Sequence, residues 1–299
     1  MTEVARSGSV APPGDDNPER PAGSPDVAPA ASWVRGSVPL RLPVAELRSP
    51  LVEASTHQVL VRIPTVARYL GERDGDIRAE PVPGVSDAEV ESFASRAVRP
   101  LCWLLAGQFC VSGSAVVVAG ELIVVTGPPS AGKSALAAAL ARRGHRAVGD
   151  SMIRLDDSGD GRLRLGDGGA NLDLWPDVED ALGIPRGRRL RAGIDKRSHD
   201  LAPGRGETVR RVLCLSPDAR LDRAGRLVAC SPLPLAEAVN ALAGHHPYRR
   251  LVGPLRLGSR HAEWVAAACR SELLSLRRAE GPLDATLAAL CEAVESTVG

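Results

Sequence analysis

The sequence of 299 residues is poor in aromatic residues, in lysine and in net charge, and its cysteines lack a zinc-binding spacing. Phe, Trp and Tyr make up 3% of the chain although hydrophobic residues make up 44%, so the core must be built mainly from Leu, Val and Ala. The formal net charge of +1 argues against a nucleic-acid or membrane partner recruited by bulk electrostatics. Because the cysteines include no C-x-x-C pair, we expect six reduced, mostly buried thiols, at positions 102, 110, 214, 230, 269 and 291.

The sequence also shows no signal peptide and no transmembrane segment. The N-terminus has no basic region followed by an apolar run, as a secretory signal peptide requires. Apolar stretches fall short of the roughly 20 residues that a transmembrane helix needs. We therefore expect a cytoplasmic protein without a membrane partner, long enough for one large domain or two modest ones.

Lysine is the rarest cation in the chain. Two of the 37 Lys and Arg residues are lysines, which leaves 35 arginines. In a chain that uses arginine almost everywhere, a lysine suggests a site where a compact, flexible ammonium is needed. Lys133 lies in the glycine-rich loop discussed next, so Lys196 becomes a candidate site residue, with a chance remainder as the alternative.

A glycine-rich loop with the spacing Gly-x-x-x-x-Gly-Lys-Ser follows the apolar run Leu122–Val125. This spacing is typical of a phosphate-binding P-loop, and the run after it is rich in helix formers up to a glycine cap at Gly144. Strand, loop and helix therefore predict an α/β nucleotide-binding unit. The candidate phosphate-binding residues are Gly127, Pro128, Pro129, Ser130, Ala131, Gly132, Lys133 and Ser134.

Each residue type in this loop has a physical role in binding phosphate. The backbone N–H groups and the positive end of the helix dipole favour an anion. Gly127 and Gly132 allow backbone conformations that a Cβ would obstruct. Lys133 supplies a charge for the β and γ phosphates, and Ser134 a hydroxyl for Mg²⁺.

Asp150 is the second candidate on this segment. We interpret Ala147–Ser151 as a short strand that ends in a carboxylate, 17 positions after Lys133 and beside the loop. Such a carboxylate suits either a Mg²⁺ ligand or a general base toward an attacking hydroxyl. The alternative is an ordinary aspartate in a turn at a strand end.

The rest of the chain divides into four parts. Residues 1–32 hold six of the 24 prolines and no apolar periodicity, so we expect a disordered tail. Residues 33–105 predict a small α+β lead-in with strands and one amphipathic helix from Ser86 to Leu105. Residues 106–250 form the predicted P-loop core. Residues 251–299 predict two amphipathic helices, His261–Arg278 and Leu283–Val298, which pack on the sheet or serve a partner, a second copy of the chain included.

Within the core, a strand over Phe109–Val118 turns at Ala119-Gly120 into the loop strand, which predicts a hairpin. Ser112 and Ser114 lie on one face of that strand and are open to either a site role or an exposed polar face. A second hairpin is expected over Ile153–Leu165. A basic run follows in the loop region. It is equally consistent with a solvated face and with cations that close over a phosphate. Its members are Arg186, Arg188, Arg189, Arg191, Lys196 and Arg197.

The segment GPPSAGKSALAAALARRGHRAVGDSMIRL resembles the P-loop, helix and next strand of the HPr kinase/phosphorylase family and its bacterial relatives. The resemblance extends through NLDLWPD, the lysine-containing loop and ETVRRVLCLS, from about Val59 to Arg250. It implies a phosphoenolpyruvate-carboxykinase-like core with a mixed sheet. It also implies an ATP- and Mg²⁺-dependent serine kinase whose partner is a protein or peptide bearing a serine.

By this resemblance Asp150 is similar to the family's catalytic base, and Ser134 would coordinate Mg²⁺. From the residues themselves we also expect Asp150 at the metal, and Lys196 or nearby arginines stabilising the transferred charge. Ser112 stands where the family usually has a histidine, and Ser151 where it has a second aspartate. These departures keep two alternatives open. One is a catalytically degenerate ATP-binding switch or scaffold, and the other is a small-molecule kinase or ATPase.

Overall fold

The structure, a computed structural model, describes residues 32–166, 171–191, 193–202, 204, 206–223 and 225–298. The tail predicted over 1–32 lies outside this part of the chain, apart from Ser32. The described chain is a mixed α/β fold with three sheets. Among the described residues, none of the helices combines the length and the apolar character that crossing a bilayer requires.

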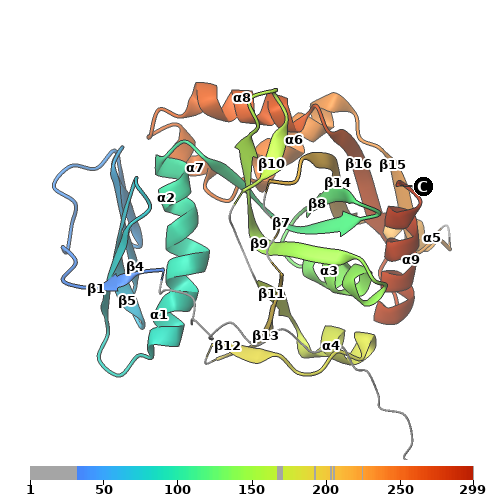
Figure 1. The fold of residues 1–299 in the computed structure, drawn as a ribbon, viewed down its shortest axis with the longest axis horizontal. Helices are drawn as coiled ribbons and strands as arrows, with labels where there is room; N and C mark the ends of the chain where they lie inside the picture. The colour runs from blue at the N-terminus through green and yellow to red at the C-terminus, as the bar shows by residue number, and fades with distance from the viewer. Residues whose placement is uncertain are drawn as a thin grey trace, which may run out of the picture. The chain divides into compact units, whose positions relative to one another are not determined.

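The first sheet has six short strands in the order β1-β6-β5-β4-β3-β2. Figure 1 shows it beside helices α1 (Asp87–Phe93) and α2 (Arg99–Leu105). Neighbouring strands are antiparallel except β1 and β6. Alternate residues such as Val59 and Tyr69 are buried toward the helices that follow, and the Tyr69 hydroxyl donates to the Val90 carbonyl. The strands are β1 (Val34–Arg35), β2 (Leu47–Arg48), β3 (Val52–Ala54), β4 (Gln58–Ile63), β5 (Ala67–Glu72) and β6 (Ile77–Pro81).

The predicted lead-in helix is present as one helical run, α1 (Asp87–Phe93), η1 (Ala94–Val98) and α2 (Arg99–Leu105). Ser86 caps it, because its side chain accepts a hydrogen bond from the Glu89 N–H at 3.3 Å. The middle segment η1 is a single π-helical turn, a feature often found at functional sites. Arg96 on this turn reaches the candidate site.

The central sheet has seven strands in the order β10-β9-β7-β8-β14-β16-β15. Strand β14 runs parallel to β8 and to β16, and the other neighbours are antiparallel, so the sheet is mixed. The strands are β7 (Phe109–Val118), β8 (Glu121–Thr126), β9 (Arg146–Asp157), β10 (Leu163–Leu165), β14 (Val209–Pro217), β15 (Val228–Pro232) and β16 (Glu272–Arg278).

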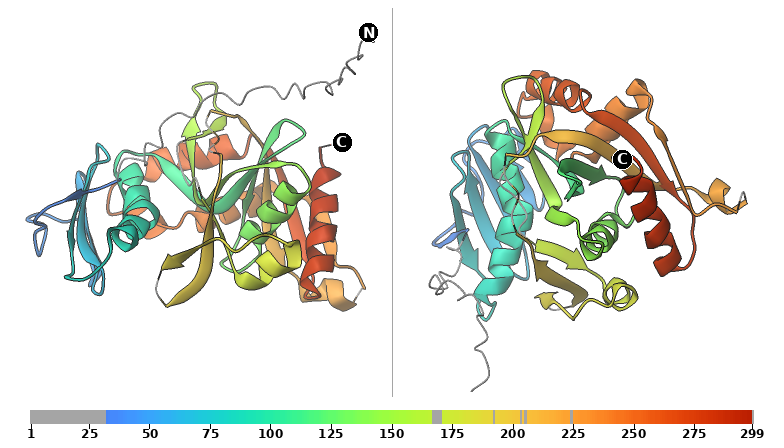
Figure 2. Two further views of the ribbon diagram at one scale, coloured as in Figure 1. Left: turned by 60° about the horizontal axis from the view of Figure 1, so that its bottom comes forward. Right: turned by 45° about the vertical axis from the view of Figure 1, so that its right-hand side comes forward.

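Period-2 alternation divides this sheet between two cores. Ile123 and Val125 of β8 face the core that contains α3 and α9, whereas Leu122 and Val124 face the core that contains α6 and α8. Figure 2 shows α3 and α9 lying together on one side of the sheet, and the two helices contact each other. The helices are α3 (Lys133–Arg142), α5 (Ala219–Arg223), α6 (Leu235–His245), α7 (Arg249–Val252), α8 (Gly258–Ala268) and α9 (Leu283–Glu295).

A third sheet of three antiparallel strands, in the order β11-β13-β12, contacts α3 through β11. Its strands are β11 (Asn171–Leu174), β12 (Arg188–Arg191) and β13 (Ile194–Asp200). Helix α4 (Pro176–Leu182) follows β11 and ends at Gly183, which has a left-handed φ of 59°. Pro176 at its first position and Gly183 after its last suit a short helix here.

Both predicted hairpins of the core are confirmed. Strands β7 and β8 pair antiparallel across a turn in which Ala119 and Gly120 have φ of 48° and 84°, and β9 and β10 form the second hairpin. The order of strand, loop and helix from β8 to α3 is also confirmed, with Gly144 at φ 96° after the helix. All six cysteines are free, and four of them are buried.

Two predictions about elements are wrong. The strand expected to end at Asp150 continues as β9 to Asp157, and β7 lies between it and β8. Polar residues at 150 and 151 resemble a strand end, but Ser151 takes a φ of 73° and the strand continues past it. The helix expected over His261–Arg278 ends at Ala268, and its second half is β16, which sits between β14 and β15 in the sheet. Tertiary pairing there outweighs helical periodicity.

Candidate nucleotide site

The loop between β8 and α3 has the backbone strain that its glycines allow. Gly127, Ser130 and Gly132 have φ of 154°, 61° and 105°. A Cβ on Gly127 would collide with the carbonyl oxygen of Leu215 on β14, so the close approach of two parallel strands requires glycine there. Gly132 is the N-cap of α3, which begins at Lys133. The loop therefore brings the positive end of α3 to its own concavity.

Lys133 folds back over this loop. Its Nζ donates to the carbonyl oxygens of Gly127 and Pro128 at 3.0 and 2.8 Å. Burial lowers the pKa of Lys133, and the nearby positive charge of Lys196 lowers it further, while Asp150 opposes both. The ammonium group is thus held over the loop by two carbonyl groups that a bound anion would replace.

Asp150 lies inside the sheet, 3% exposed, with its carboxylate directed at the start of α3. Its Oδ1 accepts hydrogen bonds from Ser114 Oγ at 2.5 Å and from Ser134 Oγ at 3.0 Å. Its Oδ2 accepts from the Asp173 backbone N–H at 3.2 Å. Burial raises the pKa of Asp150, and the three hydrogen bonds oppose that rise without cancelling it.

Asp173 on β11 is a second carboxylate that sequence reasoning missed. Its oxygens form a bidentate pair with Arg96 at 3.0 and 3.1 Å, and its negative charge also raises the pKa of Asp150. An acidic residue between Leu172 and Leu174 in an apolar strand was the available signal. Arg96 lies 77 positions away on η1, and the sequence carried no sign of this pairing.

Lys196 on β13 lies near the same carboxylates. Its Nζ lies 5.6 Å from the ring centroid of Trp175, which is 49% exposed at the start of α4. A cation over an indole face is favourable at this distance. The structure thus brings both lysines of the chain to one place, although they are 63 positions apart in sequence.

Arg278, the last residue of β16, is a further cation that the sequence did not point to. Its Nε donates to the carbonyl oxygen of Ala131 in the loop at 2.7 Å. Strands β8, β14 and β16 are parallel, so their carboxyl ends meet at one edge of the sheet, where the loop begins. Because the sequence predicts a helix over His261–Arg278, it does not place Arg278 at this edge.

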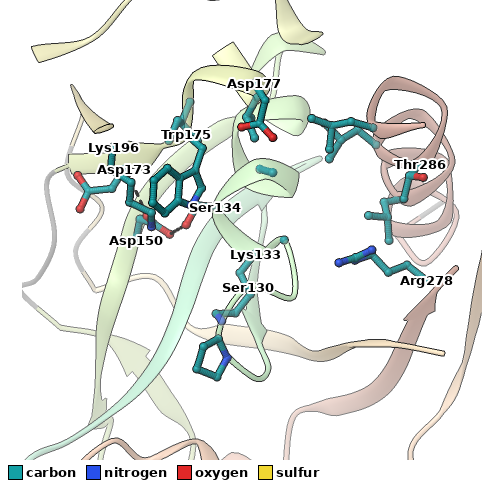
Figure 3. A pocket seen from close by; sticks show the side chains of 18 of the residues that line it. Ser130, Lys133, Ser134, Asp150, Asp173, Trp175, Asp177, Lys196, Arg278 and Thr286 are labelled. Carbon is teal, nitrogen blue, oxygen red and sulfur yellow. Dashed lines mark hydrogen bonds between the residues drawn. The ribbon is translucent and has the colours of Figure 1, made fainter. Parts of the chain in front are cut away.

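These side chains line one cavity of about 470 Å³ (Figure 3). Asp150, Asp173 and Lys196 lie on one side of the loop, and Arg278 and Thr286 lie on the other. Of the eight predicted loop residues, five line the cavity, namely Pro129, Ser130, Gly132, Lys133 and Ser134. The size falls within the range of small-ligand pockets.

The donor set at Ser134 and Asp150 fits Mg²⁺. One hydroxyl and one carboxylate oxygen lie 3.0 Å apart at the start of α3, and Mg²⁺ prefers oxygen ligands. Clusters of three or more His, Cys, Asp or Glu side chains suited to a metal are absent from the described part of the chain. The remaining ligands of a Mg²⁺ ion here would be phosphate oxygens and water, as is usual for nucleotide sites.

Most of the basic run lies elsewhere. Arg186 and Arg197 pair with the buried Glu179 of α4, and Arg191 lies over the Phe93 ring. These contacts hold the third sheet to its neighbours, and Lys196 is the member of the run that lines the cavity. His246 is likewise structural, because its Nδ1 faces the Cys110 carbonyl within an aromatic cluster.

Comparisons with known proteins leave the family open. No family model matches the chain, and no curated protein matches it. Among solved structures, the chain is similar to the HPr(Ser) kinase/phosphatase from Coxiella burnetii, with 14% identity and a TM-score of 0.33. The match covers 63% of this chain and 90% of that one. Because a likeness this distant carries no argument, the function depends on the geometry of the site itself.

Proposed function

We propose that this protein is an ATP- and Mg²⁺-dependent kinase that transfers the γ-phosphate to a serine hydroxyl of a protein or peptide. One observation carries the proposal: the buried carboxylate of Asp150 accepts a hydrogen bond from Ser134 at the first turn of the helix after the glycine-rich loop. A carboxylate at that point is where phosphoryl-transfer sites hold a metal or a base.

The loop residues supply the phosphate contacts. Backbone N–H groups of residues 127–134 and the N-terminus of α3 favour the phosphates. Lys133 would leave the carbonyl groups of Gly127 and Pro128 and bind the β and γ phosphates. Ser134 and Asp150 would hold Mg²⁺, which neutralises charge on the phosphates when bound.

Asp150 is also the proposed base. Its Oδ2, which does not contact Ser134, is the oxygen available to accept the proton. The proton of the serine hydroxyl passes to Asp150 as the serine oxygen bonds to the γ-phosphorus, and the bond from that phosphorus to the leaving oxygen of ADP breaks. Lys196 stabilises the negative charge on the transferred group from the side of β13.

The test is transfer from γ-labelled ATP with Mg²⁺ to candidate proteins and peptides, followed by mass spectrometry for phosphoserine. We expect Lys133→Ala and Asp150→Asn to lose transfer while retaining the far-UV spectrum of the wild type. A matched control is Ser112→Ala, a cavity-lining truncation that keeps both groups. Robust turnover by Asp150→Asn would remove this aspartate from the mechanism.

The second candidate is an ATP-binding switch or scaffold without catalysis. It is favoured by the three hydrogen bonds that already occupy the carboxylate of Asp150, from Ser114, Ser134 and the Asp173 backbone. Ligand at 100 times its Kd should then raise stability by about 2.7 kcal/mol while no acceptor is phosphorylated. Turnover of a metabolite without protein phosphorylation would instead select a small-molecule kinase or ATPase.

A further inference from the structure

We infer that the nucleotide lies across the cavity in one direction, with its γ-phosphate toward Asp150 and Lys196 and its base against helix α9. This inference rests on the proposed function and assigns a base-binding site to residues with no role in the phosphate contacts. Its wall is built from α9 by Leu283, Leu287 and Leu290, and Arg278 lies between this wall and the loop.

The two ends of the cavity differ in polarity. The end at β9, β11 and β13 holds the carboxylates of Asp150 and Asp173 and the ammonium group of Lys196. The opposite end is lined from α9 by leucines spaced four and three residues apart, which is the spacing of one helix face. Val178 of α4 contributes to the same apolar lining.

The residues that would hold Mg²⁺ indicate the direction of the phosphate chain. A Mg²⁺ ion held by Ser134 and Asp150 would neutralise charge on the terminal phosphates. Ser134 and Asp150 therefore mark the γ-phosphate end, and the nucleoside must leave the loop on the side away from Asp150. Figure 3 shows that this is the side where Arg278 and Thr286 lie.

Arg278 is placed to contact the phosphates that lead to the nucleoside. Its Nε is fixed by the carbonyl oxygen of Ala131, and its Nη1 lies 3.3 Å from the Ala279 carbonyl. The guanidinium group points from β16 toward the loop. A guanidinium group held in this way is pre-organised for phosphate oxygens.

The reverse direction is physically unfavourable. It would place an aromatic base beside the ammonium group of Lys196, which would lose water without gaining a charged partner. It would also leave the leucines of α9 beside a triphosphate. The arrangement of charges in the cavity therefore favours the nucleotide base at α9. Inorganic tripolyphosphate would occupy the same loop as ATP but has no base, so it probes the phosphate contacts alone.

The experiment compares binding of ATP and of inorganic tripolyphosphate by calorimetry in Mg²⁺. Leu283 is half-buried at the rim of the wall, so Leu283→Trp should fill the base site without unfolding the protein. We expect this substitution to weaken the binding of ATP at least 10-fold and that of tripolyphosphate less than 2-fold. Ala288→Trp places the same bulk on the exposed face of α9 and should change neither. Arg278→Met should weaken both ligands at least 5-fold.

Photolabelling of the wild type gives an independent readout. Irradiation with 8-azido-ATP, followed by peptide mapping, should mark residues 279–290. Labelling within 171–200, or equal weakening of both ligands by Leu283→Trp, would overturn the inference while leaving nucleotide binding intact. A wild type that binds neither ligand would overturn the proposed function, and the base site with it.

Discussion

Removing the hydrogen bond from Ser114 to Asp150 tests whether the Asp150 carboxylate is ionised inside the sheet. The two residues pair directly across β7 and β9, and Ser114 is fully buried with its Oγ 2.5 Å from Asp150 Oδ1. A hydrogen bond to a charged group contributes about 1.5–3 kcal/mol. We therefore expect Ser114→Ala to lower the free energy of unfolding by about 2 kcal/mol at pH 8, which lowers Tm by about 4 °C in a chain of this size.

The loss of stability caused by Ser114→Ala should depend on pH, because the charge of Asp150 does. Burial raises the pKa of Asp150 above its unfolded value, so its contribution to stability is fully present below about pH 4 and is lost as pH rises through the folded pKa. The Ser114 hydroxyl opposes this loss by lowering the pKa. Ser114→Ala should therefore cost most when the carboxylate is ionised, and only about 1 kcal/mol, that of a neutral hydrogen bond, in acid.

The assay is urea unfolding followed by tryptophan fluorescence at pH 8 and pH 5. Ser112→Ala is the matched control, a truncation on the same face of β7 at a half-buried position that pairs with Met152. We expect it to cost less than about 0.5 kcal/mol at both pH values. A cost of Ser114→Ala below that figure at pH 8 would refute an ionised Asp150.

Three further changes test the site. Asp150→Asn removes a buried charge, so it should raise the free energy of unfolding in urea at pH 8 by about 1 kcal/mol while phosphate transfer is lost. A variant less stable than the wild type would contradict the inferred cost of burying this charge. Gly127→Ala should collide with the Leu215 carbonyl at a φ of 154° and lower that free energy by about 2 kcal/mol or more; an unchanged Tm would count against the loop geometry. Arg96→Met leaves the buried Asp173 carboxylate unpaired and should cost about 2–3 kcal/mol, and a second change, Asp173→Asn, should recover part of it.

The local parts of the fold were predictable from the sequence. The order from β8 through the loop to α3 follows from an apolar run, two glycines and a run of helix formers. The hairpin turn at Ala119-Gly120 and the cap at Ser86 are equally local, because each depends on residues within four positions of one another. Such elements form wherever the chain has this spacing, so their tertiary surroundings matter little.

The parts that the sequence missed depend on contacts between distant residues. Arg278 bonds to a loop carbonyl 147 positions away, and Arg96 to Asp173 across 77. Segment 272–278 becomes a strand because β14 and β15 pair with it on both sides, although its own periodicity admits a helix. Periodicity within a segment contains no information about which neighbours will flank it, so β16 and its terminal arginine could not be placed.

The position of Asp150 shows how the sheet itself builds the site. Its strand β9 is separated from the loop strand β8 by β7, but α3 packs over both β7 and β9, so the carboxylate of Asp150 meets Ser134 on the face of the sheet that α3 covers. At this level β7 carries the small residues Ser112, Gly113 and Ser114. Ser114, directly opposite Asp150, donates a hydrogen bond to its carboxylate. The acid–base character of the site is therefore determined by a strand outside the loop motif.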